Sequence, residues 1–198
     1  NARGTSRYHL VRAVEGSLSR LKTDYLDLFF FHRWDEQTAI EESVRAIETL
    51  VQQGKILYVG VSNFSAWQTM KTLALHPICA VQPMYNLVKR QAEVEILPMA
   101  ESERLAVFPY SPMGGGLLSG KYGVGKRPES GRLTSNKMYM TRYGADSNYQ
   151  IAEAFALLSQ ELGHPAPALA VAWVASHPAV TAPIIGARSL EQLQVALQ

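Results

Sequence analysis

The stretch "YLDLFFFHRWDEQ" (residues 25–37) runs from a nearly unbroken apolar segment directly into His32, Arg33, Asp35 and Glu36. A core strand usually ends in turn residues such as Gly, Asn or Pro. This one ends in an imidazole, a group that gains and loses a proton near neutral pH. The stretch therefore indicates a buried strand that carries a chemically active side chain at its carboxyl end.

Apolar runs and amphipathic segments alternate along the rest of the chain. The apolar runs that predict further buried strands occupy residues 55–64, 78–86, 105–112 and 180–187. Helical spacing of apolar residues predicts helices over 6–21, after Thr38, after Ser65, over 91–103 (with Pro98 interrupting or restarting it), 148–162, 166–177 and from Ser189. Residues 113–147 are rich in Gly, Lys and Arg with little periodicity, which is typical of a long loop with short helical pieces.

Three local patterns predict where these helices begin and end. Ser6 is expected to cap the first helix. Thr38 and Ser65 are each followed three residues later by Glu or Gln, the spacing of a capping box. Gly54 stands where a helix is expected to end in the left-handed conformation.

Buried strands that alternate with helices indicate an α/β fold with a parallel sheet. A doubly wound sheet and a (β/α)₈ TIM barrel both fit this alternation, and both collect chemistry at the carboxyl ends of the strands. Polar side chains follow all five predicted strands, which favours the barrel. Because about five of the eight strands of such a barrel are present, we expect residues 1–198 to form a single domain that is a partial barrel.

The composition excludes several other classes of protein. Hydrophobic residues make up 47% of the 198 residues and the formal net charge is +2, without a basic cluster that would indicate nucleic-acid binding. No apolar run reaches the ~20 residues of a membrane helix. The single cysteine, Cys79, cannot form an intramolecular disulfide and fits a reducing compartment, so we expect a cytoplasmic protein. No histidines have the spacing of metal ligands.

Polar residues at the ends of the second and third strands are candidates for ligand binding. Ser62 and Asn63 can exchange hydrogen bonds with an amide group, and Gln82 adds a carboxamide at the next strand end. The alternative for Asn63 and Ser65 is a local role as helix caps. For His32 the alternative is a histidine whose hydrogen bonds are satisfied by neighbouring backbone.

The segment "PYSPMGGGLLSGKY" (109–122) contains a glycine turn and a misleading motif. Gly115 to Lys121 matches G-x-x-x-x-G-K, but Tyr122 replaces the Ser or Thr that a P-loop needs for magnesium. Three glycines still suit close approach of the backbone to a phosphate. Downstream, Arg188 precedes the last helix, where an anion would also be favoured.

Taken together, "DYLDLFFFHRWD", "GKILYVGVSNFS", "VQPMYNLVKR", "PYSPMGGGLLSGKY" and "PIIGARSLEQL" resemble the motifs of the aldo-keto reductases, in the same order and over essentially the whole chain. The resemblance implies a barrel of the aldo-keto reductase type that spans the helix before the fourth strand to the start of the last helix. It also implies NADPH-dependent reduction of aldehydes and ketones.

The resemblance assigns roles to particular residues. His32 matches the catalytic-site histidine that orients the substrate carbonyl. The positions that match cofactor-binding residues are Ser62, Asn63 and Gln82 for the nicotinamide carboxamide, Tyr110 for the ring, Ser111, Met113, Gly115 and Lys121 along the pyrophosphate, Arg132 in the loop, and Gly186, Arg188 and Gln192 for the adenosine 2′-phosphate. The family often continues this last segment with Glu and Asn, whereas this chain has Val195 and Ala196, which leaves NADH open as a cofactor.

The family's proton-donating tyrosine, with its lysine and aspartate, comes from the first three strands. No motif in these residues matches them, so we expect the chain to be a fragment that is inactive alone. Two alternatives to an enzyme remain: a cofactor-binding regulatory subunit of the same fold without turnover, and a truncated product without function. The expected partner is a small carbonyl substrate, with neither nucleic acid nor membrane, and the sequence does not indicate an oligomeric state.

Overall fold

A computed structural model describes residues 3–198. The chain forms two compact units. Unit 1 comprises Asn1–Pro83 and Glu95–Val107, and unit 2 comprises Met84–Val94 and Phe108–Gln198. In the described residues, no helix combines the length and the apolar character that crossing a membrane requires.

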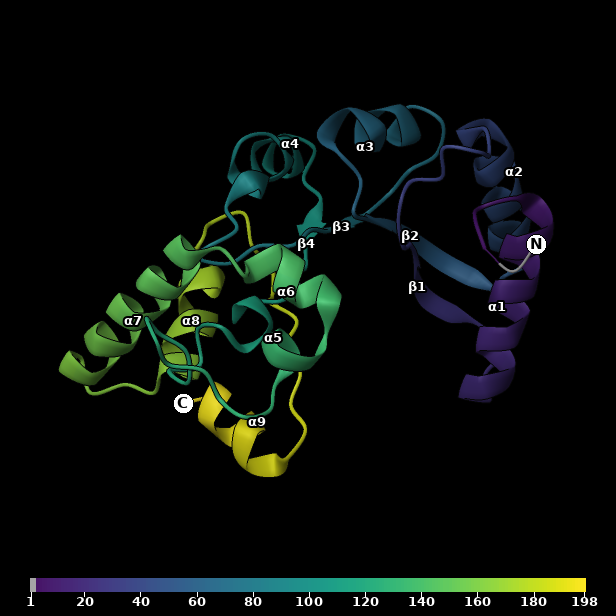
Figure 1. Cartoon of the computed structure of the whole chain (residues 1–198). Helices are drawn as coiled ribbons and strands as arrows, with labels where there is room; N and C mark the ends of the chain where they lie inside the picture. Colours follow the sequence, from purple (N-terminus) through teal and green to yellow (C-terminus); the bar gives the residue numbers. More distant parts are fainter. Residues whose placement is uncertain (1–2) are drawn as a thin grey trace. The chain divides into compact units, whose positions relative to one another are not determined.

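Unit 1 is built around a four-stranded parallel sheet with the order β1-β2-β3-β4 (Figure 1). The strands are β1 (Leu26–Phe31), β2 (Ile56–Ser62), β3 (Ala80–Gln82) and β4 (Ala106–Val107). Phe31 pairs with Val61, and Ser62 pairs with Gln82. The carboxyl ends of β1, β2 and β3 therefore meet at one edge of the sheet, as the alternating pattern predicts.

Four helices connect and flank these strands: α1 (Arg7–Leu21), α2 (Ile40–Gln52), α3 (Ala66–Leu73) and α4 (Ile96–Ser102). The α1 helix packs beside α2. The apolar face of α2 is buried through Ile40, Val44 and Ile47. The parallel strands of unit 1 are thus accompanied by amphipathic helices, which confirms the α/β class.

The predicted helix ends are confirmed in three places and wrong in one. Ser6 accepts a hydrogen bond from the backbone N–H of His9 at the start of α1. Ser65 and Gln68 form the complete capping box of α3, and Gly54 is left-handed (φ 71°) after α2. The predicted box at Thr38 does not form, because α2 starts at Ile40 and its N-cap is Ala39, which has no side-chain oxygen.

Strands β3 and β4 are shorter than the apolar runs 78–86 and 105–112 predicted. Pro83 follows Gln82 directly, and Pro109 lies two residues after Val107. Proline has no N–H to donate to a neighbouring strand, so regular pairing stops beside it. The predicted helical region 91–103 is likewise divided into η1 (Gln91–Glu93) and α4. Pro98 lies in the first turn of α4, where a missing N–H is tolerated.

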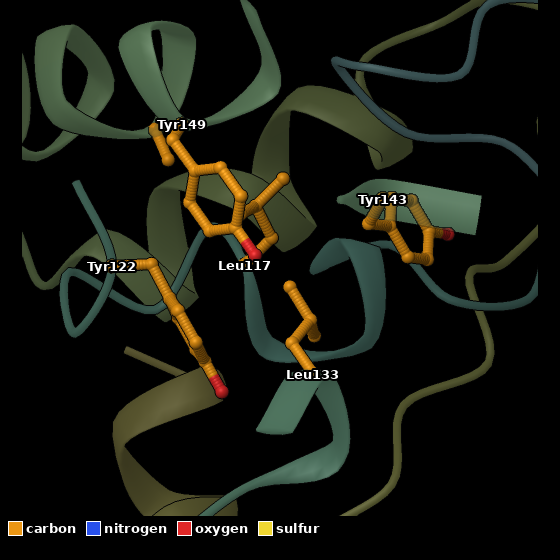
Figure 2. Packing of buried hydrophobic residues seen from close by; sticks show 6 residues of the cluster. Leu117, Tyr122, Leu133, Tyr143 and Tyr149 are labelled. Carbon is orange, nitrogen blue, oxygen red and sulfur yellow. The ribbon is translucent and has the colours of Figure 1, made fainter. Parts of the chain in front are cut away.

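Unit 2 contains η1 and further short and long helices: η2 (Gly114–Gly116), α5 (Arg132–Ser135), α6 (Lys137–Tyr143), α7 (Asp146–Glu161), α8 (Ala166–Ala175) and α9 (Leu190–Ala196). The long loop with short helical pieces predicted for 113–147 is confirmed by η2, α5 and α6. Figure 2 shows Tyr122 and Tyr149 converging on Leu117 and Leu133. This loop is therefore held by its own buried side chains and by Tyr149 of α7.

The predicted fifth strand over 180–187 is wrong. In the described residues this segment contributes one isolated bridge, in which Ile184 pairs with Tyr110. The N–H of Ile184 donates to the carbonyl of Pro109 at 2.7 Å. Pro183 precedes Ile184 and lacks an N–H, so the ladder cannot extend in that direction.

Candidate functional site

His32 follows the carboxyl end of β1 and is exposed. Its imidazole makes no hydrogen bond to residues 3–198, whereas its backbone carbonyl accepts one from Nδ2 of Asn63 at 2.8 Å. The backbone of His32 is thus fixed to the residue that follows β2. The ring remains available to a ligand, which argues against a histidine satisfied by neighbouring backbone.

Ser62 and Asn63 form a hydrogen-bonded link across the edge of the sheet. Asn63 is left-handed (φ 56°), and its Nδ2 also donates to Oγ of Ser62 at 3.1 Å. Ser62 is 2% exposed, and its hydroxyl donates to the carbonyl of Gln82 at 2.9 Å. Because Ser65 caps α3, Asn63 is not a cap, and its amide instead joins the ends of β1 and β2.

Gln82 ends β3 with a half-buried side chain. Its carboxamide has no hydrogen-bond partner among the residues that the structure describes, although its backbone carbonyl accepts from Ser62. An amide with both its donors and its acceptor available can form a complementary pair with another amide. In unit 1, the side chains left for a ligand at this edge therefore include an imidazole and a carboxamide.

The predicted site residues that lie in unit 2 begin with Tyr110 and Ser111. Tyr110 is half-buried and forms isolated parallel bridges with Met84 and Ile184. Burial raises the pKa of Tyr110, and the nearby charge of Arg142 opposes that rise. Ser111 is left-handed (φ 58°), a conformation that is uncommon for a residue with a Cβ.

Asn86, a residue not predicted from the sequence as part of the site, holds the Ser111 turn. Its fully buried carboxamide donates to the carbonyl of Ser111 at 3.0 Å and to the hydroxyl of Tyr143 at 3.2 Å. Its Oδ1 accepts from the backbone N–H of Val88 at 3.2 Å. The backbone of Ser111 is thus fixed by a side chain that is distant in sequence.

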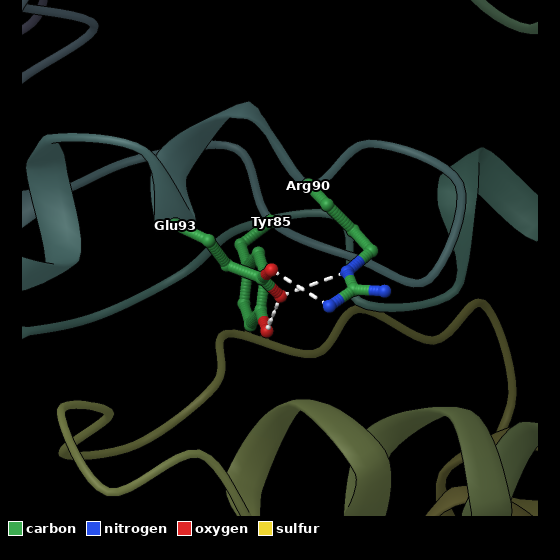
Figure 3. Close-up of polar contacts among 3 residues, drawn as sticks. All are labelled: Tyr85, Arg90 and Glu93. Carbon is green, nitrogen blue, oxygen red and sulfur yellow. Dashed lines mark hydrogen bonds and ion pairs between the residues drawn. The ribbon is translucent and has the colours of Figure 1, made fainter.

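Hydrogen bonds among Tyr85, Arg90 and Glu93, called the Tyr85–Arg90–Glu93 clip below, hold the segment from Met84 to Val94. The hydroxyl of the buried Tyr85 donates to Oε1 of Glu93 at 2.6 Å, and Arg90 donates to both carboxylate oxygens at 2.9 and 2.7 Å (Figure 3). Burial, followed by the Glu93 contact, raises the pKa of Tyr85 far above its usual range. The hydrogen bonds from Arg90 and Tyr85 lower the pKa of Glu93. The Tyr85 ring also packs on Trp173, 5.3 Å between centroids, which ties this segment to α8.

The glycine turn Gly114–Gly116 has positive φ values of 59°, 69° and 103°. A Cβ on Gly115 would lie 2.5 Å from Cδ1 of Tyr139, so the tyrosine ring covers the turn at this position. Within the described chain, the N–H of Gly115 makes no hydrogen bond. A glycine backbone with an unused N–H is a feature of anion-binding turns, so this turn stays a candidate for phosphate binding.

The remaining loop residues differ in their surroundings. Met113 packs against the hydrophobic cluster that contains Leu118 and Phe155. Lys121 is exposed. The guanidinium carbon of Arg132 lies 5.5 Å from the centroid of the Tyr139 ring. The structure thus brings Arg132 and Gly115 to the same tyrosine, while Met113 has a packing role.

Gly186, Arg188 and Gln192 lie before and within the first turn of α9, and all three are exposed. Oε1 of Gln192 accepts from the backbone N–H of Arg188 at 3.0 Å, and Ser189 caps the helix by accepting from the N–H of Gln192. The Gln192 side chain therefore fixes the backbone of Arg188. Among residues 3–198, no carboxylate forms an ion pair with the Arg188 guanidinium.

In the part of the chain that the structure describes, neither a metal-binding cluster nor the pocket at Tyr25 and Gln53 marks the position of these candidate site residues. Among residues 3–198, no cluster of His, Cys, Asp or Glu could hold a metal ion. A pocket of about 510 Å³ is lined by Asp24, Tyr25, Gln53, Gly54, Lys55 and Leu57. It lies at the amino ends of β1 and β2, opposite the edge that carries His32, so the candidate site consists of the polar side chains described above and not of this pocket.

Comparison with known proteins shows to which family this chain belongs. The Aldo/keto reductase family matches residues 1–198. The chain belongs to this family. An uncharacterized oxidoreductase, YrpG, of Bacillus subtilis (strain 168) is 39% identical, over 97% of this chain and 59% of its own length. A probable voltage-gated potassium channel subunit beta of Oryza sativa subsp. japonica is 36% identical, over 98% of this chain and 62% of its own length.

Comparison with solved structures shows which fold this chain has. The glycerol dehydrogenase AKR11B4 from Gluconobacter oxydans matches with a TM-score of 0.84 and 31% identity, over 98% of this chain and 59% of that chain. The fold is therefore the TIM-barrel fold of the aldo-keto reductases, as the sequence motifs predicted. The chain spans about three fifths of the length of these relatives.

Proposed function

We propose that the protein is an NADPH-dependent oxidoreductase that reduces aldehydes or ketones to alcohols, with NADH as an open second cofactor. The observation that carries this proposal is the His32 imidazole, which is exposed at the carboxyl end of β1 and makes no hydrogen bond to residues 3–198. Membership of the family supports the same reaction. A small carbonyl compound is the expected substrate and the cytoplasm the expected location.

Each group of residues has a part in this proposal. NADPH supplies a hydride when it is bound. A ring N–H of His32 donates a hydrogen bond to the substrate carbonyl and orients it. The Gln82 carboxamide pairs with the nicotinamide amide, and Asn63 and Ser62 hold the edge that carries both side chains. Tyr110 offers a ring for stacking, and Ser111, Met113, Gly115, Lys121 and Arg132 form the pyrophosphate segment.

At the other end of the cofactor, Arg188 binds the adenosine 2′-phosphate, with Gly186 and Gln192 shaping the backbone around it. A guanidinium is well suited to a phosphate because it presents several donors in a fixed plane. We place the proton-donating tyrosine, with its lysine and aspartate, outside these 198 residues. The whole protein is therefore needed for turnover.

The test is the oxidation of NADPH by the protein made from its complete reading frame. We expect a loss of absorbance at the nicotinamide band that depends on an added aldehyde, measured over a panel of small aldehydes and ketones. The proposal fails if the protein binds NADPH, measured by calorimetry, but no carbonyl compound accelerates its oxidation.

That failure would support a second candidate, a cofactor-binding regulatory subunit without turnover. The similarity to a protein named as a probable potassium channel subunit beta favours it. The available His32 imidazole argues for the enzyme, because a subunit that only binds cofactor does not need it. Binding without carbonyl-dependent oxidation therefore separates the two.

A further inference from the structure

Two arginines from different short helices meet at one tyrosine in unit 2. Arg132 begins α5, and Arg142 lies near the end of α6. Their guanidinium carbons are 5.5 and 5.9 Å from the centroid of the Tyr139 ring. The ring also stacks on Tyr143, which is fully buried, with 6.4 Å between centroids. The Tyr139 ring thus packs on the buried Tyr143 and is also in contact with two guanidinium groups.

Neither guanidinium is neutralised by the described chain. No carboxylate of residues 3–198 lies within 4.0 Å of Arg132 or Arg142, and neither side chain donates a hydrogen bond there. Two other arginines of unit 2 differ: Arg90 is paired with Glu93, and Arg127 donates to the carbonyls of Gly123 and Lys126. Two unpaired cations beside one ring repel each other, and an anion would relieve that repulsion.

The same ring lies on the glycine turn. A Cβ on Gly115 would be 2.5 Å from Tyr139, so the two are in direct contact, and the Gly115 N–H is unused within the described chain. The charge of Arg142 also acts on the Tyr110 hydroxyl, which places Arg142 near the start of this loop. Two guanidiniums and one available amide therefore lie around a single aromatic ring.

We propose that Arg142 binds the pyrophosphate of the dinucleotide cofactor together with Arg132, with Tyr139 as the surface that holds both guanidiniums against the glycine turn. This proposal rests on the proposed function, because it takes the turn to be part of the cofactor site. The pyrophosphate is favoured over the 2′-phosphate because both arginines contact the ring that covers Gly115, whereas Arg188 belongs to a separate segment before α9.

The test is calorimetric titration of NADPH and NADH into the protein made from its complete reading frame. NADPH and NADH share the pyrophosphate and differ in the 2′-phosphate. Loss of a charge-assisted contact to phosphate is expected to raise both dissociation constants by roughly 10- to 100-fold in Arg142→Gln. Arg142→Lys keeps the charge without the planar fork and is expected to recover part of the affinity. Lys137→Gln removes the same charge from an exposed position on α6 and is expected to bind both cofactors like the wild type.

Each outcome decides the proposal. A wild-type protein that binds both cofactors, with Arg142→Gln within twofold of it, overturns the role of Arg142 and leaves the proposed function intact. Weakened binding of NADPH alone would assign Arg142 to the 2′-phosphate and also overturn the proposal. An equal loss in Lys137→Gln would show a general charge effect and overturn it as well. If the wild type binds neither cofactor, the proposed function fails, and this proposal with it.

Discussion

At the scale of single residues, the side chains of His32 and Gln82 make no hydrogen bond to the described chain, whereas those of Ser62 and Asn63 do. Ser62 is buried and hydrogen-bonded to Gln82 and Asn63. Asn63 uses its amide on the backbone of His32 and on Ser62. The fold thus uses the Ser62 hydroxyl and the Asn63 amide to fix the edge and leaves the His32 imidazole and the Gln82 carboxamide without a hydrogen bond there.

This difference predicts separate effects on catalysis and on cofactor binding. Because the His32 ring supports no other part of unit 1, His32→Gln should fold like the wild type and bind NADPH with unchanged affinity. Its kcat should fall by roughly 100-fold or more, the loss expected when a hydrogen-bond donor to the reacting oxygen is removed. Steady-state kinetics and calorimetry measure the two quantities. His9→Gln on α1 is the control, and a kcat within a factor of two of the wild type in His32→Gln would contradict the assigned role.

The Tyr85–Arg90–Glu93 clip predicts a dependence of stability on pH. Its hydrogen bonds lower the pKa of Glu93 in the folded protein below the ordinary value of 4.5. A depressed carboxylate pKa stabilises the fold at pH values above 4.5, and this contribution is lost as the pH falls through the folded-state pKa. Glu93→Gln should therefore have a lower Tm than the wild type at pH 7.

Acid should reduce that difference in Tm. Below the folded-state pKa of Glu93, its carboxyl group in the wild type is protonated and carries no charge, like the amide of the variant. The Tm values of the wild type and of Glu93→Gln should therefore converge. Thermal unfolding followed by circular dichroism from pH 7 to pH 3 measures the convergence. Glu101→Gln, at an exposed position of α4, should show no such trend. A Tm difference that stays constant over this range would refute the clip as the cause.

At the scale of elements, the glycine turn and α6 depend on each other. Gly115 combines a left-handed φ of 69° with contact to the Tyr139 ring, whereas Gly125 has a φ of 70° and open space where a Cβ would lie. Both Gly→Ala substitutions incur the backbone cost of roughly 1–2 kcal/mol. Only Gly115→Ala must also displace a ring.

Gly115→Ala should therefore destabilise the protein more than Gly125→Ala and should weaken NADPH binding, because Tyr139 and the arginines on it move away from the turn. Chemical unfolding and calorimetry of the two variants give the comparison. Adding Tyr139→Ala to Gly115→Ala removes the clash and should recover most of the excess loss in stability. Equal losses in the two single variants would show that the ring does not constrain the turn.

The elements also show which parts of the structure can be predicted from sequence. β1 and β2 are predicted well because each is a continuous apolar run, and the Ser65–Gln68 box because its signal is local. The strand over 180–187 is wrong because its apolar composition resembles that of β2, while Pro183 prevents regular pairing. Composition indicates burial, but the backbone N–H groups decide whether a ladder forms.

The candidate site divides in the same way. His32 and Gln82 can be proposed as site residues from sequence, because each is a polar residue at the end of or within an apolar run. Asn86, Tyr139 and Arg142 cannot be proposed in this way. Asn86 ends the predicted strand 78–86, but its partner Ser111 lies 25 residues away, and Tyr139 and Arg142 lie in the loop 113–147, which has little periodicity. Only the folded chain brings these side chains to Ser111 and Gly115.

At the scale of the whole molecule, the site residues are distributed over both units, and the chain covers 59–62% of the length of the relatives compared above. Within the described residues, β1 is an edge strand of the sheet. Beside it, Leu57 and Tyr58 of β2 are 46% and 62% exposed. An uncovered edge with exposed apolar side chains favours association with other chains.

We predict that the polypeptide of residues 1–198 alone does not reduce carbonyl compounds above background and associates through its uncovered sheet edge. His32 is the one catalytic-site residue that we assign to it, and the proposed proton donor lies elsewhere. NADPH oxidation with an aldehyde, measured for this polypeptide and for the product of the complete reading frame, tests the prediction. Light scattering measures self-association in the same samples, and we expect it to be greater for the 198-residue polypeptide. Aldehyde reduction at equal rates in the two would contradict the placement of the proton donor, because residues 1–198 would then contain every group that the reaction needs.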